Sequence, residues 1–137
     1  MILDQIAMNT GPSWHRDVCF ATRANLLLIG PADITAMLLD IVRVHLEAPV
    51  ATLCAGEPLT LPQGRVGTLI VQNLSLLNPA EQAELNEALN HSLAGTQVIS
   101  TSALSLMPMV EEGRFLDILY YRLNTIYIDV RDSLPGA

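Results

Sequence analysis

Short apolar runs bounded by Gly, Pro or Asn recur along this chain, and longer segments with helical spacing of apolar residues lie between them. The short runs predict buried strands. They lie at residues 26–29, 50–54, 67–71, 97–100 and 125–128. Because strands alternate with helices, the pattern predicts an α/β fold, an open parallel five-stranded sheet with helices on both faces.

The first long segment predicts a helix over residues 34–46. Residues at helical spacing form one expected inward stripe, Ile34, Met37, Leu38, Ile41, Val42 and His45. Ala36, Leu39 and Val44 add apolar surface elsewhere on the helix, so the alternative is a helix covered on more than one side. Asp33 immediately precedes this apolar run, so we expect its carboxylate to cap the first turn. His45 is expected to interact with the terminal carbonyls of the helix rather than with a ligand.

The sequence Asn78-Pro79-Ala80-Glu81 predicts the start of a further helix. Asn is favoured at the N-cap, Pro at the first helical position and Glu at the third, where it can complete a capping box. Gly95 is expected to stop this helix. Two shorter helices are expected over residues 105–112 and 115–123.

The chain of 137 residues is long enough for a single domain with its own core. Residues 1–24 are expected to form a leader with a short helix, residues 25–130 the α/β core, and residues 131–137 a tail. No apolar run approaches the roughly 18 residues of a membrane span. The N-terminus has no basic region of a signal peptide, so we expect a cytoplasmic protein.

The formal net charge of −7 argues against direct binding to DNA or RNA, since only seven residues are Lys or Arg and they form no cluster. His15 and Cys19 could share a helix face, but they lack the further ligands of a zinc site. Cys19 and Cys54 are therefore interpreted as buried hydrophobic residues. No metal site is expected.

Residues 25–37 predict a strand, a tight turn and the start of a helix, which is where a phosphate binds in many parallel α/β proteins. A phosphate-binding loop requires the pattern G-x-x-x-x-G-K-[ST]. Gly30 matches the first glycine, whereas Ala36 stands in place of the lysine and Met37 in place of the hydroxyl residue. Ile34 or Thr35 falls where the second glycine belongs.

Asp33 adds a second argument against a phosphate at this turn, because its negative charge would repel one. We therefore interpret the turn as structural. The alternative is an unusual nucleotide site formed at Gly30, Asp33 and Thr35.

Several stretches resemble the AAA+ domain of sigma-54-dependent transcriptional activators, in the correct order from about residue 25 to residue 128. Residues 109–115 (MVEEGRF) and 119–124 (LYYRLN) are similar to the stretch that carries the arginine fingers. Residues 67–74 (GTLIVQNL) resemble the Walker B strand, and residues 98–102 (VISTS) resemble the sensor strand. The resemblance implies a three-layer, P-loop NTPase-like core.

The chain departs from the family pattern at the positions that carry ATPase chemistry. Gln72 and Asn73 replace the Walker B acids, and Ser102 replaces the sensor asparagine. Of the two arginine fingers, one position is Leu116, and only Arg122 remains. The long insertion that contacts sigma-54 is missing between the second and third strands, and the helical lid and helix-turn-helix are expected to be absent.

These departures predict a non-catalytic domain that acts in transcription regulation through protein–protein contacts and has no cofactor. The resemblance implies an interface at Arg114, Tyr120, Tyr121 and Arg122. The expected partner is a sigma-54 activator or a second copy of this chain, so a homo-oligomer is possible.

The alternative function is residual binding of ATP or ADP, with weak or no hydrolysis, through Gly30, Thr35 and Arg122. A receiver domain would need an aspartate at the end of the third strand, where this chain has Gln72. A serine hydrolase is disfavoured by the lack of a G-x-S-x-G motif.

Overall fold

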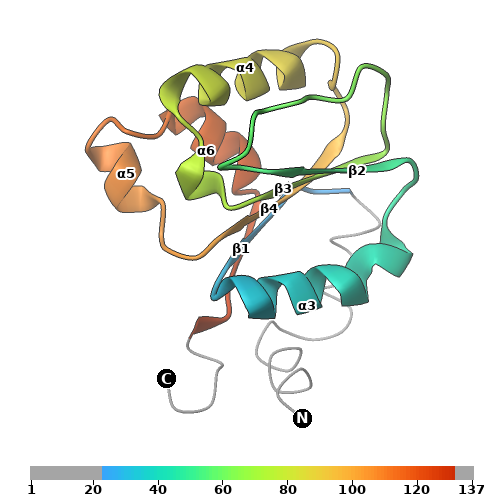
Figure 1. Ribbon diagram of the computed structural model, residues 1–137, viewed down its shortest axis with the longest axis horizontal. Helices are drawn as coiled ribbons and strands as arrows, with labels where there is room; N and C mark the ends of the chain where they lie inside the picture. Colours follow the sequence, from blue (N-terminus) through green and yellow to red (C-terminus); the bar gives the residue numbers. More distant parts are fainter. Residues whose placement is uncertain (1–22, 132–137) are drawn as a thin grey trace.

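The computed structural model describes residues 23–131 and contains one parallel sheet with the strand order β2-β3-β4-β1-β5 (Figure 1). The strands are β1 (Leu26–Ile29), β2 (Val50–Cys54), β3 (Thr68–Gln72), β4 (Gln97–Ser102) and β5 (Ile126–Asp129). The predicted α/β fold with a parallel five-stranded sheet is confirmed. The strand boundaries differ from the prediction by two residues at most.

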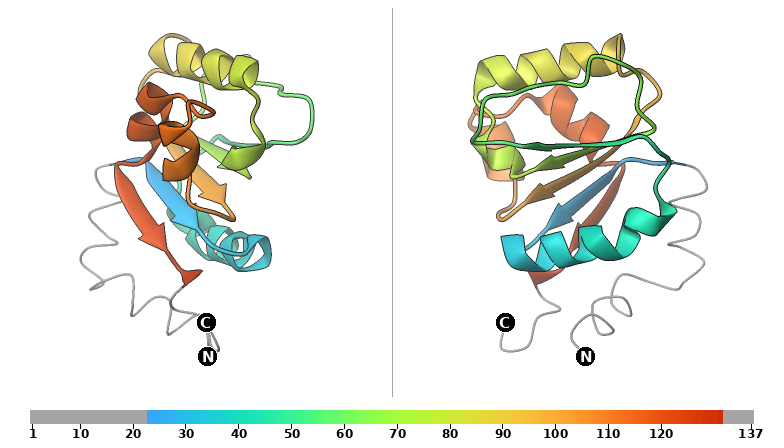
Figure 2. Two further views of the ribbon diagram at one scale, coloured as in Figure 1. Left: turned by 90° about the vertical axis from the view of Figure 1, so that its left-hand side faces the viewer. Right: turned by 45° about the vertical axis from the view of Figure 1, so that its right-hand side comes forward.

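Helices cover both faces of the sheet, as predicted (Figure 2). One face carries α3 (Ala32–Val42), which continues into the 3₁₀ turn η1 (Arg43–His45). The other face carries α4 (Pro79–Asn90), α5 (Met107–Glu111), α6 (Asp117–Leu123) and the 3₁₀ turn η2 (Leu74–Leu76). The helix predicted over residues 14–22, with His15 and Cys19, lies outside the described residues.

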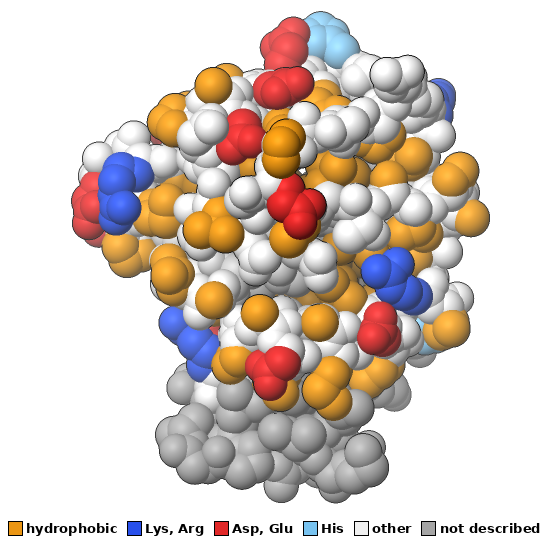
Figure 3. Space-filling view, in the orientation of Figure 1, with side chains coloured by type: hydrophobic (Ala, Val, Ile, Leu, Met, Phe, Trp, Pro, Cys, Tyr) orange, Lys and Arg blue, Asp and Glu red, His pale blue; other side chains and the backbone are white. Residues whose placement is uncertain are grey.

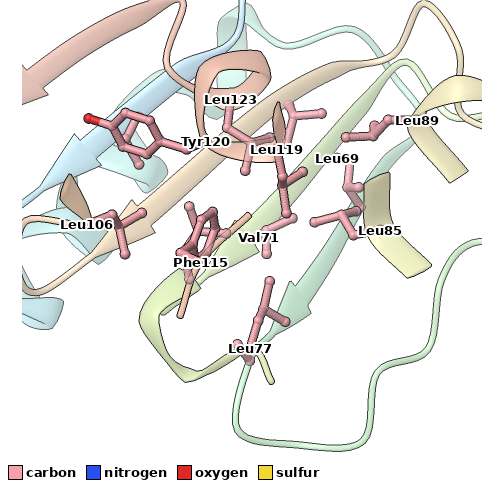
Figure 4. Close-up of a cluster of buried hydrophobic side chains, with 14 of the residues drawn as sticks. Leu69, Val71, Leu77, Leu85, Leu89, Leu106, Phe115, Leu119, Tyr120 and Leu123 are labelled. Carbon is pink, nitrogen blue, oxygen red and sulfur yellow. The ribbon is translucent and has the colours of Figure 1, made fainter. Parts of the chain in front are cut away.

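The side chains of β1 alternate between two hydrophobic clusters, one on each side of the sheet. Leu27 and Ile29 join the larger cluster beneath α4, α5 and α6, whose centre is shown in Figure 4. Leu26 and Leu28 join the smaller cluster, where Leu39 of α3 packs. This alternation follows from the two-residue period of a strand.

The buried side of α3 differs from the prediction. Thr35 and Leu39 are its buried residues, whereas the predicted inward residues Met37 and Ile41 are 40% and 49% exposed. Apolar residues occur around most of this helix, so their spacing does not select one side. Thr35 can be buried because its Oγ1 donates to the Ala32 carbonyl within the same turn, at 3.2 Å.

The connection from β1 to α3 consists of Gly30 and Pro31 alone. The Gly30 N–H donates to the Ser102 carbonyl at 3.0 Å, and the Val130 N–H donates to the Ile29 carbonyl at 2.9 Å. A Cβ atom on Gly30 would lie 2.5 Å from Val130 Cγ2, closer than real Cβ contacts come. Glycine is therefore required here by packing.

The predicted start of α4 is confirmed. Asn78 Oδ1 accepts from the Glu81 N–H at 2.8 Å, and the Asn78 N–H donates to Glu81 Oε1 at 3.0 Å, which forms the capping box. The C-cap, however, is His91. Gly95, with φ of 81°, lies in the turn after the helix rather than at its end.

Substitution of Asn78 by Ala should lower the free energy of unfolding by about 1 kcal/mol, because the hydrogen bond from the Glu81 N–H to the Asn78 side chain is lost. Urea denaturation followed by circular dichroism measures this change. Asn78→Asp is the matched control and should unfold at nearly the wild-type midpoint, since aspartate also accepts the Glu81 N–H. Equal losses in both variants would contradict a capping role.

Substitution of Gly30 by Ala should destabilise the fold by about 1–3 kcal/mol, because the added methyl group overlaps Val130. Val130→Ala removes the overlapping Cγ2 atom and should itself be destabilising, since Val130 is fully buried. A double-mutant cycle from urea denaturation should give a double variant more stable than the sum of the single losses. Strict additivity would show that the two side chains do not compete for this space.

Candidate functional site

The carboxyl ends of β1 and β4 are the place where a parallel sheet of this order binds ligands, because the chain reverses its direction across the sheet between them. In this chain only Gly30 and Pro31 connect β1 to α3 at this crevice. The Gly30 N–H donates to the Ser102 carbonyl, which is the last ladder bond of the Ile29–Ser102 pair. A two-residue turn also offers too little backbone to wrap a phosphate chain.

Gly30, Asp33 and Thr35 share the start of α3, but they do not form a phosphate cradle. The N–H groups of Ile34 and Thr35 both donate to the Pro31 carbonyl at 3.0 Å. The Thr35 hydroxyl is buried against the backbone of the same turn. The N–H groups of Ile34 and Thr35 are therefore already used within the helix.

The predicted N-cap at Asp33 is wrong. The helix begins at Ala32, its N-cap is Pro31, and no side chain caps it. Proline at this point already has an extended conformation that leads into a helix, with φ of −54°. Asp33 is exposed in the first turn, where its charge still suits the positive end of the helix dipole.

Positive charge for a phosphate is scarce across the whole sequence, which contains no lysine; all seven basic residues are arginines. The arginine beyond the end of β5, Arg131, is forked onto Asp129, with its Nε 3.0 Å from Asp129 Oδ1. The hydrogen bonds from Arg131 hold the pKa of the Asp129 carboxyl below its usual value. The negative charge of Asp129 therefore balances the positive charge of Arg131 within this ion pair.

Gln72 and Asn73 lie where the resemblance places acidic residues. Gln72 ends β3, and Asn73 follows it with a left-handed φ of 63°. The Asn73 N–H donates to Thr101 Oγ1 at 3.1 Å, and its Nδ2 donates to Cys54 Sγ at 3.4 Å. The backbone amide of Asn73 thus connects the end of β3 to β4, and its side-chain amide connects it to β2.

Ser102, at the sensor position, turns its hydroxyl back on its own chain. Its Oγ donates to the Leu104 carbonyl at 2.6 Å and accepts from the Leu104 N–H. Within residues 23–131, no group of three or more His, Cys, Asp or Glu side chains is placed to hold a metal ion.

Gln82 lies on the buried side of α4 and organises the segment that resembles the arginine-finger stretch. It is a buried polar side chain with all its hydrogen bonds directed to backbone. Its Nε2 donates to the carbonyls of Leu77 and Arg114, both at 3.0 Å, and its Oε1 accepts from the Leu116 N–H at 2.8 Å. The sequence analysis gave Gln82 no role of its own, although a polar residue on the inward stripe before Leu85 is a signal for one.

Of the four predicted interface residues, three reach the surface and one lies in the core. Arg114 and Tyr121 are exposed, and Arg114 pairs with Glu112 at 2.7 Å. Arg122 is half-buried, and its Nη2 donates to Asn90 Oδ1 at the end of α4. Tyr120 is only 5% exposed and belongs to the core.

Tyr120 therefore supports Tyr121 from the core and is not itself a surface contact. The rings of Tyr120 and Tyr121 meet edge to face, with centroids 5.3 Å apart. Two exposed apolar side chains that the sequence analysis did not place at this interface, Leu116 and Ile118, extend the surface. We call Arg114, Leu116, Ile118, Tyr121 and Arg122 the α6 face.

None of the helices between residues 23 and 131 has both the length and the apolar character that a bilayer crossing needs.

Solved structures share this fold at low sequence identity. NtrX from Brucella abortus matches in its complex with ATP (TM-score 0.66, 16% identity) and in its complex with ADP (TM-score 0.69, 17% identity). Each match covers 96% of this chain but only 37% and 36% of the NtrX chains. The Drosophila ORC structure bound to AT-rich DNA and Cdc6 matches with a TM-score of 0.62 and 17% identity, over 99% of this chain and 58% of that one.

The chain thus spans little more than a third of the NtrX chains, and these structural matches establish an AAA+ core fold. No curated protein matches the sequence. A family described as the sigma-54 interaction domain matches residues 21–132, which is most of the chain. The chain therefore belongs to the sigma-54 interaction domain family.

Proposed function

We propose that this chain is a non-catalytic sigma-54 interaction domain that acts in transcription regulation by binding another protein. The observation that carries the proposal is the short connection between β1 and α3. Only Gly30 and Pro31 separate the two elements, and Gly30 is packed against Val130, so the backbone has no loop long enough to surround a triphosphate.

The side chains around this connection support the same proposal. Phosphoryl transfer depends on positive charge and a bound magnesium ion near the phosphates, and on a group that orients the attacking water. At the matching positions this chain has Ala36, Gln72 and Asn73, which are all uncharged. Neutral amides replace neither the charge that holds magnesium nor the base.

Of the residues that the family uses for ATP hydrolysis, this chain keeps the arginine Arg122, whereas the other groups of that site are replaced. Arg122 donates to Asn90 of its own chain. We infer that it stabilises the α6 face and pairs with a partner, because an isolated arginine cannot supply hydrolysis.

The α6 face has the composition of a protein-binding surface. Aromatic and arginine side chains are enriched at interfaces, and apolar side chains at their centre. Gln82 fixes the turn that carries Arg114 and Leu116 through two hydrogen bonds, and a third joins it to the Leu77 carbonyl. Little ordering entropy would then be lost on binding. The proposed partner is a catalytic sigma-54 interaction domain of the same cell.

Calorimetric titration of the purified chain with Mg-ATP and with ADP should show no saturable heat up to about 1 mM, the concentration that corresponds to about 4 kcal/mol of binding free energy. NtrX from Brucella abortus, whose structures contain these nucleotides, serves as the positive control. Saturable binding that is lost in Thr35→Ala would instead establish the alternative, a residual nucleotide site at the start of α3. Hydrolysis assays would then follow.

Substitution of Tyr121 or Arg122 by Ala should weaken binding to a catalytic sigma-54 interaction domain from the same organism by about tenfold or more, as expected for aromatic and arginine contacts near the centre of an interface. Binding is measured by biolayer interferometry with the activator immobilised. Arg65→Ala is the control, because Arg65 is exposed, is not part of the α6 face and donates to the Ala94 carbonyl. If all three variants bind like the wild type, the α6 face is not the contact surface.

A further inference from the structure

The chain enters β1 through Arg23, Ala24 and Asn25, and this entry is bonded to both layers of helices. We call these three residues the strap. The amino ends of the parallel strands meet at this edge of the sheet. On the side of α3, Arg23 Nη1 lies 2.7 Å from Glu47 Oε2, between η1 and β2. On the side of α6, Asn25 Nδ2 donates to the Arg122 carbonyl at 2.9 Å.

Between these two contacts the strap is bonded to the starts of three other strands. Arg23 Nη2 donates to the carbonyl of Gly67, which immediately precedes β3. The Val98 N–H in β4 donates to Asn25 Oδ1 at 2.8 Å, and the Ile126 N–H in β5 donates to the Asn25 carbonyl at 3.0 Å. A continuous set of contacts therefore runs from the end of the α3 layer to the last turn of α6.

The conformation of Arg23 is unfavourable in itself, so the strap is held closed by a small margin. Its φ of 57° lies in the left-handed region, which residues other than Gly, Asn and Asp rarely adopt. Its Nε is buried without a hydrogen-bond partner among the described residues, which is a further cost. The contact with Glu47 joins two partly exposed side chains, and such ion pairs stabilise a fold only weakly. Backbone strain of this kind is typical of segments that switch between two states.

An anion does not explain the position of Arg23. Both of its Nη groups are bonded within the chain, to Glu47 and to the Gly67 carbonyl. On the face that Figure 3 shows, the arginine side chains stand apart from one another, so they form no basic patch that could bind phosphate groups. The strain at Arg23 is therefore explained by its place in the strap.

We propose that the strap is a conformational switch that couples the chain before Arg23 to the α6 face. In the closed state Arg23 fixes Asn25, and Asn25 holds the Arg122 carbonyl in the last turn of α6. Displacement of Arg23 breaks its contacts with Glu47 and Gly67 and frees Asn25, so the last turn of α6 loosens. A partner that displaces the chain before Arg23 would then weaken the α6 face without touching it, through a connected set of hydrogen bonds.

Hydrogen exchange of the full chain, followed by NMR, tests the switch in the absence of any partner. Arg23→Ala should raise the exchange rates of the Asn124 and Ile126 amides by about fivefold or more, because the strap and the end of α6 then open locally. The amides of Gly30 and Val130 lie at the opposite edge of the sheet, where their hydrogen bonds do not involve the strap. They should keep their wild-type rates.

Arg43→Ala is the matched control, because Arg43 is also an exposed arginine paired with a carboxylate, that of Asp40. It should leave the exchange rates of all these amides unchanged. Glu47→Ala removes one of the two contacts of Arg23 with less risk to the fold, and it should give the same pattern at a smaller size. Equal acceleration of every amide in Arg23→Ala would indicate a general loss of stability and would overturn the proposal. Unchanged exchange at Asn124 would also overturn it.

The effect of the switch on binding rests on the proposed function. Arg23→Ala should weaken binding to a catalytic sigma-54 interaction domain by about threefold or more, and by less than Tyr121→Ala does, since it loosens the α6 face but removes no contact. If Tyr121→Ala and Arg122→Ala bind like the wild type, the proposed contact surface fails, and the exchange pattern still decides whether the strap switches. If both weaken binding and Arg23→Ala does not, the coupling to the α6 face is overturned.

Discussion

The carboxyl end of β1 is joined by backbone hydrogen bonds to strands on both of its sides, and most of the chain's functional character depends on this constraint. Gly30 donates to Ser102 of β4, and Ile29 accepts from Val130 just beyond β5. In an open parallel sheet this is where loops usually part and admit a ligand. Here the turn into α3 is only Gly30 and Pro31, and the Val130 side chain packs against Gly30.

The α6 segment is also held in place by hydrogen bonds, and its outer side chains face solvent. Asn25, at the entrance to β1, donates to the Arg122 carbonyl at 2.9 Å and accepts from the Val98 N–H at 2.8 Å. Together with Gln82, it ties both ends of the α6 segment to the rest of the fold. Amides that bond to several backbone groups in this way fix one arrangement of the surface above them. A surface held in this way is suited to binding a protein rather than to moving during catalysis.

The sequence predicted those elements that depend on local rules. Strand β1 is continuously apolar and flanked by turn residues, and the Asn78–Glu81 capping box uses only groups within one turn. The buried side of α3 could not be predicted, because its selection depends on how Thr35 satisfies its own hydroxyl.

Likewise, the periodicity of α6 does not tell Tyr120 from Tyr121, since adjacent aromatic residues point about 100° apart and only the core decides which one is covered. The uncharged residues at the Walker B positions, Gln72 and Asn73, can be read directly from the sequence. The close packing at Gly30 cannot, because it depends on Val130, which is distant in the sequence.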